Sequence, residues 1–498
     1  MTQDFDGIVV GGGLGGLAAA IVLGASGRRI LLLEAAAELG GKAGTVTLDG
    51  VTVDTGPTVL TMPHTLLDLV RLAGLDPDDH IQLRSPSPGF RYHFADDTLL
   101  DVHHAVGDTL DSVRTTLGGH AADQLEGFLT YSRRIWEAAA PFFVEGPAPT
   151  LPNLLRIGPS DLLKVRQIDA LRTMRAAIES SVDHPHLRTL LSRYATYNGS
   201  DPRVAPATLN CIAHVELALG GHGVEGGIGH MVNVLAECAR AVGVRIQTGC
   251  RVERIATKNG RVTGVRSTDG CVFRAPIVVS NAEAAHTALD LLRDGPATGI
   301  HAHAPSSMSG WTAIVRARRR GGLHQRVPHT VVFPDNYEAE FADIFDHDRP
   351  PTQPTLYLCA QESCHGRAGW TDDEPLFVMA NAPPEPTTHT RPLQVWTDLS
   401  ARAHRRLMER GHVDSEDQLV WTRTPAELAR RFPGSRGALY GSASNDRFSA
   451  FRRPPNRIRR VPGLFLATGS AHPGGGMPLA LLSGKLAAVA AIENSPKR

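Results

Sequence analysis

The residues of this chain that could bind a phosphorylated cofactor are a group of glycines near the amino terminus. Gly11, Gly13 and Gly16 follow the pattern G-x-G-x-x-G directly after the apolar run Ile8–Val10. In such a turn, backbone amides approach a pyrophosphate at the positive end of the following helix. Glu34 ends the next apolar run, where a carboxylate accepts hydrogen bonds from a ribose diol. The four positions predict a dinucleotide site; a glycine-rich turn beside a surface glutamate is the alternative.

A second glycine pair distinguishes two cofactors that share this turn, NAD and FAD. Gly40 and Gly41 follow soon after Glu34 and precede a cation, Lys42. The block is similar to the one that follows the ribose carboxylate in the amine-oxidase and carotenoid-desaturase branch of FAD enzymes. Taken alone, it also fits a helix-capping turn with an exposed lysine. Combined with the first glycine turn, it favours FAD.

The composition excludes several functional classes. The chain has 498 residues, enough for two or three domains, and 42% of them are hydrophobic, as in globular proteins. Basic and acidic residues number 51 each, so no overall charge attracts nucleic acid. The six cysteines form no C-x-x-C pair, which predicts reduced thiols in the cytoplasm and no metal site. Neither a signal peptide nor an apolar window long enough to span a membrane is predicted.

The glycines and Glu34 need a sheet and helices to position them. The opening predicts strand, glycine turn, helix and strand, with strands apolar on both faces as in a buried parallel sheet. Two later regions have the same character: a helix followed by strands that turn at Asn259-Gly260 and Asp269-Gly270, and a carboxy-terminal strand, glycine turn and helix. Between them, residues 86–205 are Arg-rich and predicted mainly helical, and residues 286–455 contain strand candidates separated by proline-rich loops.

We therefore expect an α/β fold with α+β character overall. A Rossmann-like FAD-binding domain of the glutathione-reductase and amine-oxidase type is assembled from separated pieces, and a substrate domain with a mixed or antiparallel sheet and helices is inserted between them. The expected pieces are 1–85, 206–285 and 456–498 for the FAD-binding domain, with 86–205 as a helical, membrane-facing part and 286–455 as the sheet and helices of the substrate domain.

The carboxy-terminal block Leu466–Leu479, LATGSAHPGGGMPL, resembles the signature of bacterial carotenoid desaturases of the phytoene-desaturase type. In that family the strand, turn and helix lie under the isoalloxazine ring of FAD. Amides at the helix end then stabilise negative charge on the reduced ring. A glycine-rich junction without this role is the alternative, but His472-Pro473 and Met477-Pro478, which frame the turn, favour the family signature.

Shorter blocks resemble one subgroup, the 1-hydroxycarotenoid 3,4-desaturases or methoxyneurosporene dehydrogenases. The matching blocks are Asp54–Met62, Arg193–Tyr197, Ala205–Leu209, Ala213–Glu216, Ser306–Trp311 and Tyr357–Gln361. They span both expected domains, so the resemblance covers essentially the whole chain. Asn198-Gly199-Ser200 departs from it, because a hydrophobic residue and a glycine pair are expected there, and substrate details near that loop stay open.

The resemblance implies a set of FAD-binding residues and a smaller set around the substrate. FAD is expected to contact Gly11, Gly13, Gly15, Gly16, Glu34, Gly41, Lys42, Gly56, Pro57, Thr58, Val252, Gly469, Ser470, Gly476 and Met477. Arg193, Tyr194 and Tyr197 are expected to line the substrate passage, with ordinary packing between domains as the alternative. No catalytic residue is assigned. His472 is a candidate base, and a structural hydrogen bond is its alternative role.

The implied reaction introduces a double bond into an acyclic C40 carotenoid. A hydride leaves one allylic carbon for flavin N5, and a proton leaves the neighbouring carbon. A long conjugated chain spreads the positive charge, so the protein mainly has to orient the substrate and exclude water. A buried partner is expected for a substrate hydroxyl, because an unpaired polar group there is costly. The expected electron acceptor is oxygen or a quinone.

Contact with a membrane follows from such a substrate, because the hydrocarbon does not leave a bilayer unaided. We expect a peripheral enzyme at the inner face of the cell membrane. Residues 154–177 fit an interfacial helix pair or, equally, a solvated basic face, and their basic residues are Arg156, Lys164, Arg166, Arg172 and Arg175. The similar stretch 451–460, FRRPPNRIRR, is broken by prolines and is expected to form a surface loop.

Three other functions stay open on the sequence alone. One is a desaturase or saturase of the same family that acts on phytoene or a related acyclic carotene. A flavin amine oxidase shares the amino-terminal blocks but frames its flavin with aromatic side chains, and no aromatic residue lies between Ala467 and Arg498. A prenyl-protein escort keeps the fold without flavin chemistry; the intact Glu34 and glycine turn argue against it.

Overall fold

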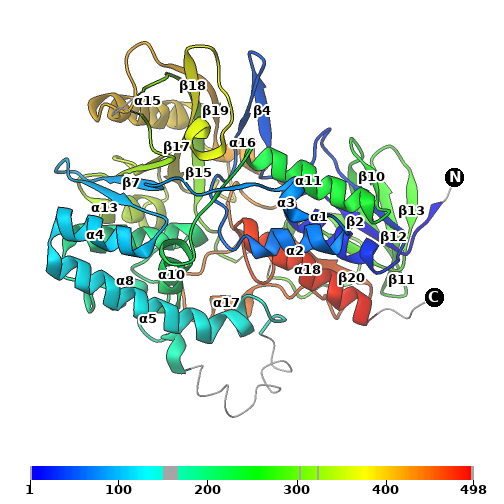
Figure 1. Ribbon diagram of the computed structural model, residues 1–498. Coiled ribbons are helices and arrows are strands. Elements are labelled where there is room, and N and C mark those ends of the chain that lie inside the picture. The colour runs from blue at the N-terminus through cyan, green and yellow to red at the C-terminus, as the bar shows by residue number, and fades with distance from the viewer. Residues whose placement is uncertain (1–2, 150–165, 302–303, 322–324, 495–498) are drawn as a thin grey trace.

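The computed structural model describes residues 3–149, 166–301, 304–321 and 325–494. Both chain ends lie on one side of the molecule, beside the sheet that contains β2 (Figure 1). The long helix α5 and the strands β7 and β15 lie on the other side. The molecule therefore has two parts, and the chain passes between them several times.

The first part is built on a five-stranded parallel sheet. In spatial order its strands are β10 (Arg245–Gln247), β3 (Ile30–Leu33), β2 (Gly7–Val10), β14 (Val278–Ser280) and β20 (Leu464–Leu466). Every neighbouring pair is parallel. All strands except β10 are buried along their whole length, because layers cover both faces of the sheet. Three segments far apart in the sequence thus contribute to one sheet.

Helices cover one face of this sheet and a second sheet covers the other. The helices are α1 (Leu14–Ala25), α11 (Gly227–Ala241) and α18 (Met477–Glu493), which share a core with Val9 and Leu32. Ile8 and Leu33 point the opposite way, because side chains alternate along a strand. They pack against a four-stranded sheet of β1 (Gln3–Asp4), β13 (Val272–Arg274), β12 (Arg261–Ser267) and β11 (Val252–Lys258).

The first and last helices cross closely because small residues meet where they touch. A Cβ at Gly484 of α18 would lie 2.2 Å from the carbonyl oxygen of Gly15 in α1. A Cβ at Gly15 would lie 2.3 Å from the carbonyl oxygen of Ala467, just after β20. Neither position accepts a larger residue without a shift of the backbone. This contact brings the two glycine turns, at the start and near the end of the chain, to the same edge of the parallel sheet.

The second part is built on a seven-stranded sheet. In spatial order its strands are β19 (Gln418–Arg423), β15 (Ser309–Arg318), β18 (Asp373–Ala382), β17 (Leu356–Ala360), β16 (His329–Val332), β7 (Phe90–His93) and β8 (Leu99–Val102). Neighbours are antiparallel except for the parallel pair β16 and β7. Helix α15 (Leu393–Glu409) packs on one face. The α/β fold with a mixed substrate sheet, predicted from the sequence, is confirmed.

Helices cover the opposite face of the seven-stranded sheet. They are α4 (Val106–Leu117), α5 (Gly119–Phe143), α8 (Met174–Glu179), α9 (Pro185–Ser192), α10 (Cys211–Leu217), α13 (Tyr337–Phe341) and the 3₁₀ helices η2 (Arg193–Asn198) and η3 (Ala207–Asn210). Ala213 and Leu217 share a core with Tyr92 of β7. The chain therefore returns from the second part to the first part only after α10, and not at residue 206, where the sequence analysis placed this boundary.

Residues 86–205, predicted mainly helical, also supply the two short strands β7 and β8 to the sheet, which the sequence analysis did not identify. The aromatic residues Phe90 and Tyr92 occupy alternate positions of β7 and are both buried, which favours a strand over a helix. Of the basic stretch 154–177, residues 154–165 lie outside the described residues.

Short elements complete the fold. They are the strands β4 (Thr45–Leu48), β5 (Val51–Asp54), β6 (Leu83–Arg84) and β9 (Gly223–Val224), the helices α2 (His64–Leu72), α3 (Pro77–His80), α12 (Ala284–His286), α14 (Gln361–His365), α16 (Pro425–Arg431) and α17 (Ser449–Arg452), the 3₁₀ helix η1 (Arg166–Ile168), and the π-helical turns η4 (Thr287–Leu291) and η6 (Ala342–Asp346). Among the described helices, none is both long and apolar enough to cross a bilayer.

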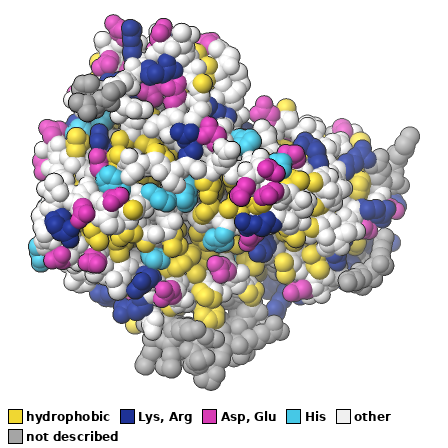
Figure 2. Space-filling model, viewed as in Figure 1, with side chains coloured by type: hydrophobic (Ala, Val, Ile, Leu, Met, Phe, Trp, Pro, Cys, Tyr) yellow, Lys and Arg dark blue, Asp and Glu magenta, His cyan; other side chains and the backbone are white. Residues whose placement is uncertain are grey.

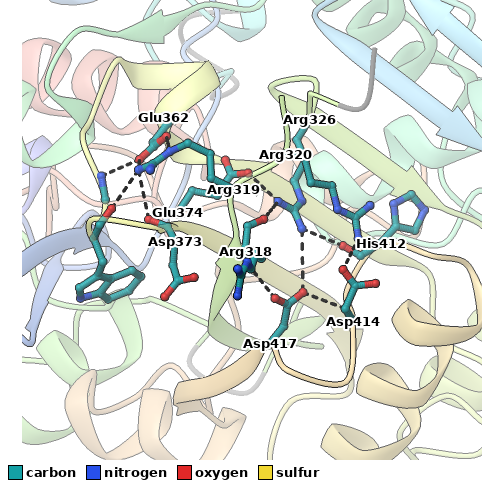
Figure 3. A network of polar contacts seen from close by, with 12 residues as sticks. Arg318, Arg319, Arg320, Arg326, Glu362, Asp373, Glu374, His412, Asp414 and Asp417 are labelled. Carbon is teal, nitrogen blue, oxygen red and sulfur yellow. Dashed lines mark hydrogen bonds and ion pairs between the residues drawn. The ribbon is translucent and has the colours of Figure 1, made fainter. Parts of the chain in front are cut away.

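A network of charges holds one end of the seven-stranded sheet (Figure 3). The Arg319 guanidinium at the end of β15 donates to Glu362 of α14 at 2.6 Å. Arg326 donates to Glu374 of β18 at 2.5 Å, and both side chains are at most 10% exposed. Because burial strengthens an ion pair but makes an unpaired charge costly, the partners depend on each other. The network fixes the sheet on which one side of the site is built.

Candidate active site

The glycine turn after β2 leaves the amino end of α1 open to a ligand. Gly11 has a φ of 100°, which glycine adopts without strain. A Cβ at Gly16 would lie 2.0 Å from the carbonyl oxygen of Gly11, so the helix begins directly against the turn. No side chain caps the helix at Gly13. The uncapped amides of the first turn therefore fit an anion such as a pyrophosphate.

Glu34 lies against this turn at the end of β3. Its carboxylate accepts hydrogen bonds from the amides of Gly12, at 2.6 Å, and Ala36, at 2.7 Å. Its carbonyl accepts from the amide of Cys250 at 2.8 Å, and Val252 begins β11 two residues later. The structure thus brings Glu34 and Val252, predicted from separate parts of the sequence, to the same end of the sheet as the glycine turn.

Asn281 is a site residue that the sequence analysis missed. It follows β14, and its Oδ1 accepts from the amide of Gly13 at 3.0 Å while its Nδ2 donates to the carbonyl of Ala467. A Cβ at Gly13 would lie 2.6 Å from that Oδ1. The only local signal was a polar residue directly after an apolar strand, at the edge of a parallel sheet where ligands bind.

The second glycine pair packs onto the first turn. The amide of Gly40 donates to the carbonyl of Gly12 at 2.9 Å, and a Cβ at Gly41 would lie 3.3 Å from Cα of Gly13. Lys42 is held by an ion pair with Glu283, 2.8 Å from Nζ to Oε1, and by carbonyl groups of residues 438 and 439. Lys42 therefore ties the amino-terminal turn to two distant segments.

The carboxy-terminal glycine turn lies on the other side of the same edge. Gly476, with a φ of 101°, precedes α18, and no side chain caps this helix either. Ser470 accepts a hydrogen bond from the amide of Ala284 at 2.9 Å. A Cβ at Gly441 would lie 2.7 Å from Cα of Ser470, so residues near 441 run directly across the turn. A second uncapped helix end thus faces the site.

A largely apolar cavity of about 410 Å³ opens from this turn into the second part of the molecule. Predicted FAD-binding residues line one side of it, namely Gly56, Pro57, Thr58, Gly476 and Met477. The other sides come from α5, η2, η3 and the strands β17 and β18. Figure 2 shows hydrophobic side chains gathered across the middle of one face, where the two parts meet. The donor set and the close glycine approaches fit FAD, with its flavin end toward the cavity.

Two of the three predicted substrate-lining residues border the cavity, and one does not. Arg193 and Tyr197 line it, whereas Tyr194 is fully buried behind them. The Tyr194 hydroxyl donates to Glu216 at 3.1 Å, and the Arg193 guanidinium lies 3.6 Å from the same carboxylate. Arg193 also donates to Tyr197 at 3.3 Å. Burial raises the pKa of the Tyr197 hydroxyl well above its usual value, so Tyr197 stays neutral. Tyr194 does not border the cavity and contributes to packing behind it.

The candidate base His472 makes a structural hydrogen bond. It lines the cavity but is only 2% exposed, and its Nε2 lies 2.9 Å from the carbonyl oxygen of Gly146. Burial lowers the pKa of His472 to about 4, so the ring is neutral near pH 7. Because a carbonyl only accepts, Nε2 carries the proton. This geometry ties the carboxy-terminal turn to the segment after α5.

Two expectations near the carboxy-terminal turn need correction. The turn has an aromatic neighbour: a Cβ at Gly475 would lie 2.9 Å from Cδ1 of Tyr440, so the lack of aromatic residues after Ala467 does not separate this protein from amine oxidases. The stretch 451–460 is not a plain surface loop, because Arg453 is only 7% exposed and lines the cavity. Burial lowers the pKa of Arg453 to about 10, which leaves it protonated near pH 7.

One group of side chains among the described residues could offer three ligands to a metal ion. His329, Cys359 and Cys364 have candidate ligand atoms within 4.8 Å of one another. His329 already pairs with the Tyr357 hydroxyl at 2.7 Å and with the Cys364 thiol at 3.5 Å. Burial raises the pKa of Cys359 to about 12, which keeps its thiol protonated.

Comparison with known proteins agrees with this geometry. The family described as flavin containing amine oxidoreductase matches residues 14–323. Solved structures that share the fold include an oxidoreductase from Methanosarcina mazei, with a TM-score of 0.62 and 14% identity, and a triple mutant of putrescine oxidase, with a TM-score of 0.64 and 16% identity. Each comparison covers 99% of this chain and 100% of the other. At such identities they show the fold alone.

Proteins with similar sequences indicate the branch of this family to which the chain belongs. Hydroxyneurosporene desaturase of Rubrivivax gelatinosus is 34% identical over 97% of this chain and 92% of its own length. The protein of the same name from Rhodobacter capsulatus is 34% identical over 99% and 98%. A 4,4'-diaponeurosporene oxygenase of Staphylococcus aureus is 29% identical over 96% of both. The chain therefore belongs to the flavin-containing amine oxidoreductases, in the branch of FAD-dependent carotenoid desaturases.

Proposed function

We propose that this protein introduces the 3,4 double bond into an acyclic 1-hydroxycarotenoid. The observation that carries the proposal is the apolar cavity that begins at the carboxy-terminal glycine turn, in a chain related at 34% identity to hydroxyneurosporene desaturases. Bound FAD supplies the acceptor for the hydride that leaves the substrate. We also propose the division of the chain that the sequence predicts, with FAD-binding pieces 1–85, 206–285 and 456–498. Helix α10 lies within the second piece but is assigned to the substrate part, because it packs in the core of that part.

The FAD-binding residues predicted from the sequence are proposed to act from three sides. Gly11 and Gly13 let the turn approach the pyrophosphate, the first turn of α1, which contains Gly15 and Gly16, presents its amides to it, and Glu34 accepts from the ribose. The uncapped end of α18 at Gly476 presents amides to the flavin. Lys42 acts mainly by joining segments, because its ammonium group already has three acceptors.

The side chains around the cavity orient the substrate and exclude water. Tyr197 is held in place by Arg193, so its ring offers a fixed face on which a polyene can stack. Met379 and Phe377 from β18 supply further apolar surface. His472 is neutral and bonded to a backbone carbonyl, which leaves no strong base in its position. This suits a substrate whose positive charge is spread over a conjugated chain.

The cavity rim supports contact with a membrane, and we include in the proposal that this is the inner face of the cell membrane. Phe451 of α17 lines the cavity and is 47% exposed, and Phe448 beside it is 51% exposed. Arg447 and Arg452 flank these rings. Exposed aromatic and cationic side chains together bind the interface of an anionic bilayer. We include in the proposal that oxygen or a quinone accepts the electrons.

Liposomes that carry single carotenoids test the proposed function. The purified FAD-bound protein is incubated with vesicles that contain phytoene, neurosporene, lycopene or the 1-hydroxy derivatives of the last two, and separately with an aliphatic amine, and the products are separated by chromatography. We expect the chromophore to lengthen much faster in the hydroxylated substrates than in the hydrocarbons. Conversion of phytoene would instead show a desaturase that acts earlier on acyclic carotenes. Release of an aldehyde from an amine, with no change in any carotenoid, would contradict the proposal.

A further inference from the structure

Three polar side chains that contact one another lie in the lining of the cavity beside the carboxy-terminal glycine turn. They are Asn198 at the end of η2, Ser444, and Arg453 after α17. Asn198 Nδ2 lies 2.8 Å from Ser444 Oγ, and Arg453 Nη2 lies 3.3 Å from Asn198 Oδ1 and 3.4 Å from Ser444 Oγ. Ser444 and Arg453 are each 7% exposed. Polar groups in such a place need partners.

The arginine fixes the direction of every hydrogen bond in this group. A guanidinium only donates, so the Asn198 atom that faces it must be the oxygen. The other amide atom, the nitrogen, then donates to Ser444. Ser444 Oγ therefore accepts from both neighbours, and its own proton is used in neither contact. Arg453 Nη2 also donates to the carbonyl of Ser442 at 3.2 Å. Among the described residues, the group thus keeps one hydroxyl donor at Ser444 and one free lone pair at Asn198 Oδ1.

This remaining capacity matches an alcohol. A hydroxyl group both accepts and donates one hydrogen bond, so it can accept from Ser444 and donate to Asn198 at the same time. A hydrocarbon would leave both groups unpaired in an apolar cavity, which is costly. A carboxylate only accepts and an ammonium only donates, so either would satisfy only part of the pair.

The group also lies where the hydroxyl of the proposed substrate has to be. Arg453 Nη1 donates to the carbonyl of Gly469 at 3.3 Å, and a Cβ at Gly474 would lie 3.4 Å from the guanidinium carbon. Residues near Gly441 run across the same turn. In a 1-hydroxycarotenoid, one methylene separates the hydroxyl carbon from the C3–C4 bond that reacts. A partner for the hydroxyl must therefore be next to the turn that faces the flavin, and not at a remote end of the cavity.

We infer that Ser444 and Asn198 form the subsite that binds the substrate hydroxyl, with Arg453 as the residue that positions both. The inference rests on the proposed function and names the residues that would give it specificity. It also gives a physical role to Asn198-Gly199-Ser200. Gly199 has a φ of 62° and would meet the Ser307 Cβ at 2.7 Å with any side chain, while Ser200 Oγ accepts from the amide of Ser444 at 3.0 Å.

Paired substrates and variants test this subsite. Wild type, Ser444→Ala and Asn198→Leu are assayed in the same liposomes with 1-hydroxyneurosporene and with neurosporene. We expect each variant to lower kcat/KM for the hydroxylated substrate by roughly fivefold to tenfold, the effect of one lost hydrogen bond. The value for neurosporene should stay the same or rise, so the preference for the hydroxyl shrinks. Ser442→Ala, a serine whose side chain does not line the cavity, is the matched control and should change neither value.

A second measurement separates binding from turnover. With the flavin reduced and oxygen excluded, each carotenoid is titrated into the protein and the quenching of Trp136, which lines the cavity, is followed. The affinity for 1-hydroxyneurosporene should fall by the same factor in Ser444→Ala, with Tm and flavin content unchanged. Arg453→Lys, which keeps a charge but not two donors from one planar group, should reduce the preference without removing either hydrogen-bonding partner.

The outcomes distinguish this inference from the proposed function. If wild type prefers the hydroxylated substrate and both Ser444→Ala and Asn198→Leu keep that preference, the subsite is wrong and the proposed function stands. If wild type converts neurosporene as readily as its 1-hydroxy derivative, the proposed substrate class is wrong and the subsite with it.

Discussion

The side chain of Asn281 joins the two glycine turns through Gly13. Asn281 Oδ1 accepts from the amide of Gly13, 268 positions away in the chain, at 3.0 Å. Its Nδ2 donates to the carbonyl of Ala467. One amide side chain at the end of β14 thus connects the ends of β2 and β20. This connection helps to hold the edge of the sheet that faces FAD, because the glycines of the two turns have no side chains with which to contact each other.

Asn281→Leu should weaken both the fold and the binding of FAD. Leucine has a similar volume but leaves the Gly13 amide and the Ala467 carbonyl without their partner, so we expect a loss of about 2 kcal/mol in the free energy of unfolding. Denaturant titration of the FAD-free protein measures the loss, and flavin fluorescence measures the affinity. Asn494→Leu, at an exposed helix end, should cost less than about 0.5 kcal/mol. Equal effects of the two substitutions would contradict the role given to Asn281.

Gly16→Ala should lower the stability of the protein, whereas Gly127→Ala should raise it. A Cβ at Gly16 would lie 2.0 Å from the backbone oxygen of Gly11, so alanine must displace the turn, and the protein should purify without FAD. Gly127 lies exposed within α5 with no atom near a new Cβ, so alanine should stabilise the protein by about 0.5–1 kcal/mol. Flavin absorbance and Tm test the pair. A yellow Gly16→Ala protein with wild-type Tm would show that the turn is more adaptable than its geometry implies.

The sequence predicted those parts of the site that depend on local pattern. Gly11 and Glu34 come directly after apolar strands, and Gly476 comes directly before an apolar helix. Their places at one edge of the sheet follow from the parallel topology. The pairing of β11 with β12 was also predictable from the sequence, because the turn between them at Asn259-Gly260 needs a positive φ that Asn and Gly adopt.

Other parts depend on contacts between distant segments and had no local signal. Tyr194 and Tyr197 lie three positions apart on the same 3₁₀ helix, and both hydroxyls donate to Glu216. Only Tyr197 borders the cavity, whereas Tyr194 is fully buried. Nothing in the string RYATY says which ring faces which way. Tyr440 and Arg453 reach the glycine turn only because the segment that contains Gly441 packs across it. The arrangement of that segment is decided by packing, which the sequence pattern does not display.

Acid should destabilise the protein through His472. Its pKa is lowered by burial to about 4, below the ordinary value near 6.5, so the folded state binds its proton only at a lower pH than the unfolded state does. The stability that the neutral ring contributes is therefore present above pH 6.5 and is lost as the pH falls toward 4, by up to about 3 kcal/mol.

The variant His472→Asn tests this assignment, because asparagine can keep the hydrogen bond to Gly146 but does not titrate. Free energies of unfolding are compared at pH 7 and pH 4.5 for both proteins. The decrease should be smaller in the variant than in wild type. Identical decreases would place the acid sensitivity elsewhere, for example at His412, whose pKa burial lowers to about 3.

The buried pair Arg326 and Glu374 should contribute to stability but not to catalysis (Figure 3). The guanidinium and the carboxylate are 10% and 5% exposed and lie 2.5 Å apart, and neither residue lines the cavity. Arg326→Met should cost about 3 kcal/mol, because it leaves a carboxylate buried and unpaired. Burial already raises the pKa of Glu374, and removal of the arginine raises it further. The cost should therefore grow as the pH rises from the wild-type pKa of Glu374 to the higher pKa in the variant, and should level off above it, because the carboxylate is then ionised in both proteins and lacks its partner in the variant.

Replacing both partners distinguishes pairing from packing. In Arg326→Met with Glu374→Leu, no charge is buried, so most of the loss should be recovered and the pH dependence should disappear. Arg318→Met, which removes the exposed partner of Glu416, should change stability by less than about 0.5 kcal/mol. Urea titrations of the four proteins at pH 6 and pH 9 give the values. A double variant as unstable as Arg326→Met at both pH values would mean that Arg326 acts through its contacts with the backbone of Arg318 and His412, and not through the carboxylate.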